Sequence, residues 1–375
     1  MKRIVPLALV AAAGLAACSS SSSSKTSSTT AATTPPTSAS VTPTTGNPTA
    51  ATTLSESGSS LLYPFLQLLE TPLTQKYSNV TLAPSAGGSG KGISDAIAGT
   101  VQMGGSDAYL SNSQLSANPG LMNIPIAVSS QAVNYNLPGI TNLKLTGDLL
   151  AKIYQGQLTK WNDPSIASLN PGVTLPSTTI VPVRRVDSSG DTFLFTSFLS
   201  ATNTAWSNGP AFGTTVTWPA APGELTASGN PGMVQTCKAT PGCVAYIGIS
   251  AESTAQSSGL GEAMLQNKAG NFLLSSASTV NAAVQAGSGG IPANLAVSLI
   301  YEPGAQSYPI VNFEYIIVKN KQSSANTALA IADFLTFAID PNGGSSPTYL
   351  SKENFVALPS IVIPKVNTAI ASISS

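Results

Sequence analysis

Three short turns rich in glycine and serine each lead into residues with helical apolar spacing, in the segments 55–69, 85–99 and 184–199. The first turn of a helix has unpaired backbone N–H groups and the positive end of the helix dipole, so it favours an anion. Arg185 stands beside the third turn. A guanidinium is a bidentate donor that stays charged and suits a tetrahedral oxyanion. We therefore expect a small oxyanion enclosed between three helix ends.

The serines of the first two turns also have an ordinary structural explanation. Ser59 and Ser60 precede the first helical segment and Ser89 precedes the second, where a hydroxyl commonly caps the helix and contributes about 1 kcal/mol. Capping and anion binding use the same N–H groups, so one turn alone does not distinguish them. The occurrence of three such turns in one chain favours binding.

The third turn places further donors close to Arg185. The hydroxyl of Ser189 and the backbone N–H groups of Gly190 and Asp191 are expected to point where the guanidinium points. The alternative is an arginine that lies at the surface or in a salt bridge, and Asp187 is a candidate partner for either interpretation.

Asp107 is the candidate acceptor of the site, because it follows an apolar stretch and a Gly-Gly pair. Hydrogen phosphate has an O–H to donate, whereas sulfate at neutral pH has none. A buried carboxylate only accepts when ionised, so it would favour phosphate and repel sulfate. The alternative is an aspartate exposed in a surface turn.

The first residues predict export and a lipid anchor. Lys2 and Arg3 precede an apolar run over residues 4–17 that ends at Cys18. This run is too short to span a bilayer and matches the hydrophobic part of a signal peptide, here residues 1–17. The order Leu-Ala-Ala-Cys is similar to a bacterial lipobox with Cys18 as the lipidated residue, and a buried core helix is the alternative.

The segment that follows the signal peptide predicts a tether. Residues 18–53 begin with Cys18 and are otherwise almost entirely Ser, Thr, Ala and Pro. This composition buries too little apolar surface to offset the entropy of ordering.

The whole chain has zero formal net charge and 9% charged residues. It has no basic run or stripe, which argues against nucleic acid as a partner.

The other two cysteines, Cys237 and Cys243, flank a short loop of an exported chain and are expected to form a disulfide. A metal pair is the alternative. The chain has no histidine and no second cysteine pair, so we expect no metal site.

Strand-like apolar runs alternate with amphipathic helices, which predicts an α/β fold. Two strand-like segments, 131–137 and 308–318, lie on either side of a long middle region. If the chain crosses between lobes at both, lobe I is discontinuous (54–132 and 309–375) and lobe II is 133–308. A hinge and an interlobe ligand cleft follow from that arrangement.

Apolar periodicity adds two expectations. The residues at helical spacing after the three turns should be core residues. They are Leu62, Phe65, Leu66, Leu69, Ile93, Ile97, Leu194, Phe195, Phe198 and Leu199. In the segment 131–137, Val133, Tyr135 and Leu137 alternate with polar residues, which predicts a half-buried strand.

The chain resembles the phosphate-binding lipoproteins that deliver phosphate to high-affinity ABC importers, especially their actinobacterial branch. The similarity covers essentially all of residues 54–375 and is carried by long strings such as SGSSLLYP, GTVQMGGSDAYLS, IYQGQLTKWNDPSIASLNPGV, VRRVDSSGDTFLFT and TPGCVAYIGIS. The resemblance implies a periplasmic-binding-protein fold of type II, with two α/β lobes that are joined by a two-strand hinge and close over one dehydrated phosphate.

Matched by motif, the resemblance implies a set of phosphate-binding residues. They are Ser59, Ser60, Leu61 (through its backbone N–H), Ser89, Asp107, Arg185, Ser189, Gly190 and Asp191. The chain departs from many members at Asp191, where threonine is common, and at Leu61, where others have an aromatic residue. Asp191 is either a second acceptor or a backbone donor only.

We therefore expect a lipid-anchored receptor on the extracytoplasmic face of the cell membrane. Its partners would be inorganic phosphate and the permease and ATPase subunits of an ABC importer, and it would have no cofactor and no catalysis. The alternatives are an exported phosphate-processing enzyme, a receptor for sulfate or another oxyanion, and a surface adhesin or antigen without a small ligand. The absence of histidine and of a base beside Ser189 argues against the enzyme, and Asp107 argues against sulfate.

Overall fold

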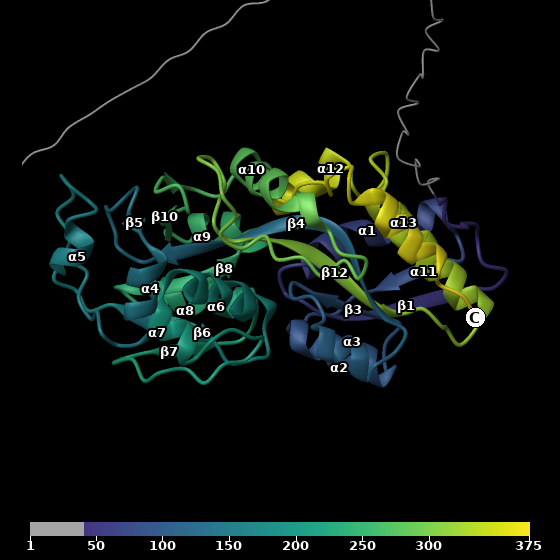
Figure 1. The fold of residues 1–375 in the computed structure, drawn as a ribbon, viewed down its shortest axis with the longest axis horizontal. Coiled ribbons are helices and arrows are strands. Elements are labelled where there is room, and N and C mark those ends of the chain that lie inside the picture. The colour runs from purple at the N-terminus through teal and green to yellow at the C-terminus, as the bar shows by residue number, and fades with distance from the viewer. Residues whose placement is uncertain (1–40) are drawn as a thin grey trace, which may run out of the picture. The chain divides into compact units, whose positions relative to one another are not determined.

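The computed structural model describes residues 41–375, and it has the α/β class that the sequence predicts. The strands are β1 (Thr52–Gly58), β2 (Val80–Ala83), β3 (Met103–Ser106), β4 (Leu121–Tyr135), β5 (Lys144–Leu145), β6 (Val181–Arg185), β7 (Leu225–Ala227), β8 (Cys243–Gly248), β9 (Gly261–Glu262), β10 (Met264–Gln266), β11 (Phe272–Leu273) and β12 (Val311–Lys319). The main sheet has the order β2-β1-β3-β12-β4-β8-β6-β7, with β9 paired to β4 (Figure 1). The short strands β11, β10 and β5 form a second sheet.

Helices pack on the strands of both halves of the main sheet. They are α1 (Tyr63–Lys76), α2 (Ser89–Ala98), α3 (Asn112–Ala117), α4 (Gly147–Tyr154), α5 (Pro164–Ala167), α6 (Gly190–Thr202), α7 (Thr204–Asn208), α8 (Gly229–Ala239), α9 (Glu252–Ser257), α10 (Ala277–Gly287), α11 (Ala325–Ile339), α12 (Pro347–Leu350) and α13 (Ile363–Ala371). Helices α1, α2, α11 and α13 pack on β1–β4, whereas α8 packs on β6, β7 and β8 and α6 packs on β8. Within residues 41–375, no helix is both long and apolar enough to cross a membrane.

The long antiparallel strands β4 and β12 run side by side through the middle of the sheet (Figure 1). They pair from Leu121 opposite Lys319 to Ser130 opposite Val311. From Gln131 onwards β4 pairs with β8 instead. Strand β4 therefore belongs to two groups of strands, one around β1–β3 and one around β6–β8.

The expected strands differ from the observed ones in length and burial. The strand predicted at 131–137 begins ten residues earlier, at Leu121, and ends at Tyr135, and the strand predicted at 308–318 is β12. The prediction of a half-buried strand was wrong, because the polar residue Asn134 is as buried as Val133. Helices and loops cover both faces of the central strands, so polar residues there are enclosed and hydrogen-bonded rather than exposed.

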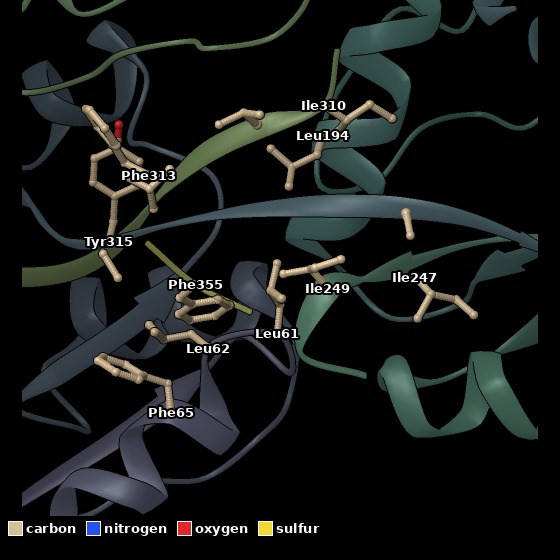
Figure 2. Packing of buried hydrophobic residues seen from close by; sticks show 14 of the residues in the cluster. Leu61, Leu62, Phe65, Leu194, Ile247, Ile249, Ile310, Phe313, Tyr315 and Phe355 are labelled. Carbon is tan, nitrogen blue, oxygen red and sulfur yellow. The ribbon is translucent and has the colours of Figure 1, made fainter. Parts of the chain in front are cut away.

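The helix faces predicted to be core are buried in one continuous apolar cluster, with Ile97 packed at its edge. Figure 2 shows Leu61 and Leu62 of the first turn beside Phe355, in the same cluster as Phe313 of β12. Leu61 is fully buried, and its side chain lies close to Gly248 at the end of β8. Leu61 therefore fills the core behind the turn.

Ordered structure begins before residue 54, where the tether was expected to end. The backbone N–H of Gly46 donates to Asp333 over 2.8 Å, and that of Thr49 donates to Asn326 over 3.1 Å, both on α11. Strand β1 begins at Thr52. The predicted signal peptide, Cys18 and the tether up to residue 40 lie outside the described residues.

Cys237 and Cys243 form the expected disulfide, with their Cα atoms 5.3 Å apart. It joins α8 to the first residue of β8. Both cysteines are fully buried.

Candidate anion-binding site

The three predicted turns lie at the carboxyl ends of strands, which is where ligands bind in open α/β sheets. The first turn follows β1, Asp107 follows β3, and the third turn follows β6, whose last residue is Arg185. Strand β1 is parallel to β3, and β6 is parallel to β8. The topology therefore brings together residues that are more than one hundred positions apart in the sequence.

Ser59 joins the first turn to Asp107. Its Oγ accepts the backbone N–H groups of Leu61 and Leu62, each over 3.0 Å, and its hydroxyl donates to Asp107 Oδ1. Ser59 is thus both the cap of the turn and a donor within the site.

Ser89 makes the equivalent contact from the second turn. Helix α2 begins at Ser89 itself, and its N-cap is Gly88 rather than the serine. The Ser89 hydroxyl donates to Asp107 Oδ2 over 3.2 Å, and its oxygen accepts the backbone N–H of Asp107 over 3.1 Å. Ser89 therefore does not cap the helix, and its side chain is free to hold the carboxylate.

The third turn reaches the same carboxylate through a residue without a side chain. Ser189 caps α6 by accepting the N–H of Thr192 over 3.4 Å. A Cβ on Gly190 would overlap both Asp107 Oδ2 and Ser89 Oγ. Only glycine lets the N-terminus of α6 come this close to the second turn and Asp107.

Arg185 is only 3% exposed and is held by two carboxylates. Its Nε donates to Asp187 Oδ1 and its Nη1 to Asp191 Oδ2, each over 2.8 Å, and Nη2 also contacts Asp187. Arg184 points elsewhere, to Glu224 at 3.0 Å. The two adjacent arginines therefore have different partners, as the alternation of side chains along a strand requires.

Asp191 has a role that neither sequence-based alternative described. Its Oδ2 accepts from Arg185 and from Asn230 Nδ2 at 2.9 Å, and its Oδ1 accepts from Gln131 Nε2 at 3.1 Å. These donors occupy the carboxylate and fix it against the guanidinium. Asp191 thereby positions Arg185.

Ser60 links the first turn to a fourth helix end. Its Oγ accepts the backbone N–H of Asn230 over 3.2 Å, at the start of α8. Asn230 also donates to Asp191 and accepts the N–H of Gly248 over 2.8 Å. The sequence Ser-Gly-Asn-Pro-Gly (228–232) at the start of α8 is the signal that would have identified Asn230, because it resembles the other three turns.

The two most buried aspartates of the site, Asp107 and Asp191, are difficult to ionise. Burial, followed by the nearby Asp191, raises the pKa of Asp107 to about 7, although the Ser59 hydroxyl and Arg185 oppose this rise. Burial also raises the pKa of Asp191, and Arg185 opposes it. For Arg185, burial lowers the pKa, but the two aspartates outweigh it and hold the pKa above its ordinary value. An oxyanion that carries its own proton suits this balance of charges.

A cavity of about 640 Å³ adjoins these turns. Gly90 and Ala108, the neighbours of Ser89 and Asp107, line one side, and Phe193 of α6 lines another. Residues 41–375 contain no group of three or more His, Cys, Asp or Glu side chains arranged to hold a metal ion. The donors present are hydroxyls, backbone amides and a guanidinium, which is chemistry for an oxyanion.

Comparison with known proteins agrees with this assignment. The model of the PBP superfamily domain matches residues 42–342. The phosphate-binding protein PstS of Pasteurella multocida is 33% identical over 320 residues, which cover 85% of this chain and 90% of that protein. PstS3 of Mycobacterium bovis is 31% identical over 337 residues, covering 86% and 87%.

A solved structure shares the fold. The phosphate-binding protein of Stenotrophomonas maltophilia aligns with a TM-score of 0.63 at 20% identity and covers 86% of this chain and 93% of its own. The chain therefore belongs to the PBP superfamily and, within it, to the family of the phosphate-binding proteins PstS.

Proposed function

We propose that the protein is an extracytoplasmic receptor that binds inorganic phosphate and delivers it to an ABC importer. The observation that carries the proposal is the buried Asp107 carboxylate, which contacts the hydroxyls of two turns and packs against the N-terminus of a third. A carboxylate among oxyanion donors is useful only if the ligand carries a proton. The relatives named phosphate-binding protein support the same ligand.

The proposed ligand contacts follow from the turns. The hydroxyls of Ser59, Ser60, Ser89 and Ser189, the backbone N–H groups of Leu61, Gly190 and Asp191 and the guanidinium of Arg185 would donate to phosphate oxygens, and Asp107 would accept the O–H. Phosphate has five heavy atoms, and a ceiling near 1.5 kcal/mol per atom corresponds to an affinity of roughly micromolar. The protein would be a binding protein and not an enzyme, as its relatives' names indicate.

The two groups of strands support a two-lobed receptor. We propose that residues 54–132 and 309–375 form lobe I, that 133–308 forms lobe II, and that β4 and β12 form the hinge. The change of β4's partner between Ser130 and Gln131 lies close to the proposed boundary. The proposed site takes Ser59 and Asp107 from one group and Arg185 from the other, so closure of the two lobes would enclose the ligand.

Native mass spectrometry of the purified protein tests the proposed function. We expect a single phosphate adduct that survives a molar excess of sulfate. Preferential sulfate binding, or the absence of any oxyanion adduct, would contradict the proposal. Turnover of a chromogenic phosphoester would favour the phosphate-processing enzyme instead.

The proposal includes a lipid anchor at Cys18, which the sequence Leu-Ala-Ala-Cys supports. The expected partners are the permease and ATPase subunits of the importer. We also propose that the chain is of the actinobacterial type, which the match to PstS3 of Mycobacterium bovis supports.

Replacing Cys18 with alanine should release the protein from the membrane without changing its phosphate affinity, because Cys18 lies far from the site in the sequence. Fractionation without detergent, followed by phosphate titration of the released protein, measures both effects. A variant that stays in the membrane fraction would exclude the lipoprotein assignment.

A further inference from the structure

A second buried carboxyl group, Glu314, lies behind Asp107. Glu314 belongs to β12, which pairs antiparallel with β3 so that Tyr315 lies opposite Ser106. Asp107 follows Ser106 directly, and Asn312 Nδ2 donates both to the Asp107 backbone oxygen over 3.5 Å and to Glu314 Oε1 over 2.8 Å, so Glu314 and Asp107 are neighbours. Glu314 is fully buried and Asp107 is 2% exposed, so this pair of acids is shielded from water.

The two oxygens of Glu314 have different surroundings. Oε1 accepts from the Ser129 hydroxyl over 2.5 Å and from Asn312 Nδ2 over 2.8 Å. Among the described residues, Oε2 has no donor. The carboxyl groups of Glu314 and Asp107 lie close enough for each to shift the pKa of the other. Two carboxyl groups can share a hydrogen bond only when one of them carries a proton.

The donors identify Glu314 as the protonated partner. Asp107 accepts from the hydroxyls of Ser59 and Ser89, as a carboxylate does. In Glu314 the donors meet only Oε1, which is the pattern of a neutral acid whose Oε2–H faces outward as a donor.

The wider surroundings of Glu314 also favour its neutral form. Strand β12 packs on β3, β4, α2 and α10. Strand β4 and helix α10 contain no charged residue, and the two charged residues of α2, Lys91 and Asp95, pair with each other. Tyr315, the next residue on β12, donates its hydroxyl to Leu295 and not to Glu314. Burial and the adjacent Asp107 hold the pKa of Glu314 well above its ordinary value.

We propose that Glu314 is a positioning residue of the phosphate site: its Oε2–H donates to Asp107 and keeps that carboxylate ionised and oriented as an acceptor. The part that concerns the ligand rests on the proposed function. No proton leaves the pair when phosphate binds, because phosphate supplies the proton of its own hydrogen bond to Asp107. Glu314 thereby determines the lowest pH at which the Asp107 carboxylate still accepts the phosphate O–H.

Two substitutions separate this role from packing. Glu314→Gln keeps the shape, with its oxygen available to Ser129 and Asn312 and its amide N–H to Asp107, but it has no titratable proton. Glu314→Met keeps an unbranched side chain and removes the donor. Without the donor, the pKa of Asp107 should rise further, so that at pH 7 it is mostly protonated.

Phosphate titrations of wild type, Glu314→Gln and Glu314→Met from pH 6 to 9 test the role. We expect Glu314→Gln to bind within about threefold of wild type and Glu314→Met to bind about fivefold more weakly at pH 7, because a rise of one unit from a pKa of about 7 lowers the ionised fraction of Asp107 from about one half to about one eleventh. The deficit of Glu314→Met should narrow towards pH 9, where Asp107 ionises again. If Glu314→Met lost the same affinity at every pH, the loss would reflect packing, which does not depend on pH, and the proposal would be overturned. An unchanged phosphate affinity in Glu314→Met would overturn it as well.

Infrared spectroscopy at pH 7 tests the proton directly and without phosphate. The C=O stretching band of a buried neutral carboxyl should be present in wild type and lost in Glu314→Gln. Glu56→Gln is the matched control, because burial raises the pKa of Glu56 to about 8. Its C=O band should disappear in this variant, while the pH dependence of phosphate affinity stays unchanged. No band lost from Glu314→Gln would overturn the proposal. If wild type fails to bind phosphate, the proposed function fails, and this measurement still decides the protonation of Glu314.

Discussion

Replacing Arg185 with alanine is expected to weaken phosphate binding by about 2–5 kcal/mol, because it removes one partner of a buried, hydrogen-bonded charge pair. In affinity this is roughly a thirtyfold loss or more. Arg185 is almost fully buried and holds Asp187 and Asp191 through three donor atoms. Without it, two carboxylates would remain at the site with no cation to oppose the charge of the ligand.

Arg184→Ala provides the matched control one residue away. Arg184 pairs with Glu224 and stacks against Trp218, and its side chain is 24% exposed. We expect this variant to bind phosphate within about threefold of wild type, since partly exposed pairs contribute little. Titration calorimetry gives both affinities, and thermal unfolding verifies that each variant is folded. Equal losses in the two variants would mean that Arg185 is not the ligand of the site.

Local sequence signals predicted the turns and the helices that follow them. The Gly/Ser turns and the helical spacing that follows them depend on neighbouring residues, and the structure brings Ser59, Ser89 and Asp107 into contact as expected. The partner of Arg185 was also accessible from the sequence, because Asp187 is two positions away. Caps, turns and short-range pairs leave a signature in the sequence because their partners are adjacent in it.

The remainder of the site depends on strand register, which short-range patterns do not encode. Gln131 and Glu314 come from β4 and β12, and nothing in their local sequence distinguishes them from other polar residues of a sheet. Asn134 likewise appeared to face solvent, because alternation indicates two faces of a strand but not what covers each face. Even for Asp191, the sequence did not show that three donors from separate elements would surround its carboxylate.

Asp107→Asn should reduce the preference for phosphate over sulfate, because the amide can donate to an oxyanion as well as accept from one. Phosphate loses a charged acceptor for its O–H, while sulfate no longer meets a carboxylate. In wild type the preference itself should depend on pH. The pKa of Asp107 lies at about 7, above its ordinary value of 3.8, so the ionised acceptor is present above pH 7 and is lost as the pH falls through that value.

Asp191→Thr is the informative comparison, because it replaces the second carboxylate of the same site with a hydroxyl. The Asp191 oxygens already accept from Arg185, Asn230 and Gln131, so we expect this variant to change the phosphate-to-sulfate ratio less than Asp107→Asn does. If Asp191 does accept from the ligand, phosphate affinity in wild type should fall as the pH rises and the ligand loses a proton, and Asp191→Thr should flatten that dependence. Competition titrations with both anions from pH 5 to 9 distinguish the two aspartates. An unchanged ratio in Asp107→Asn would contradict the acceptor role of Asp107, and selectivity would then arise elsewhere in the cleft.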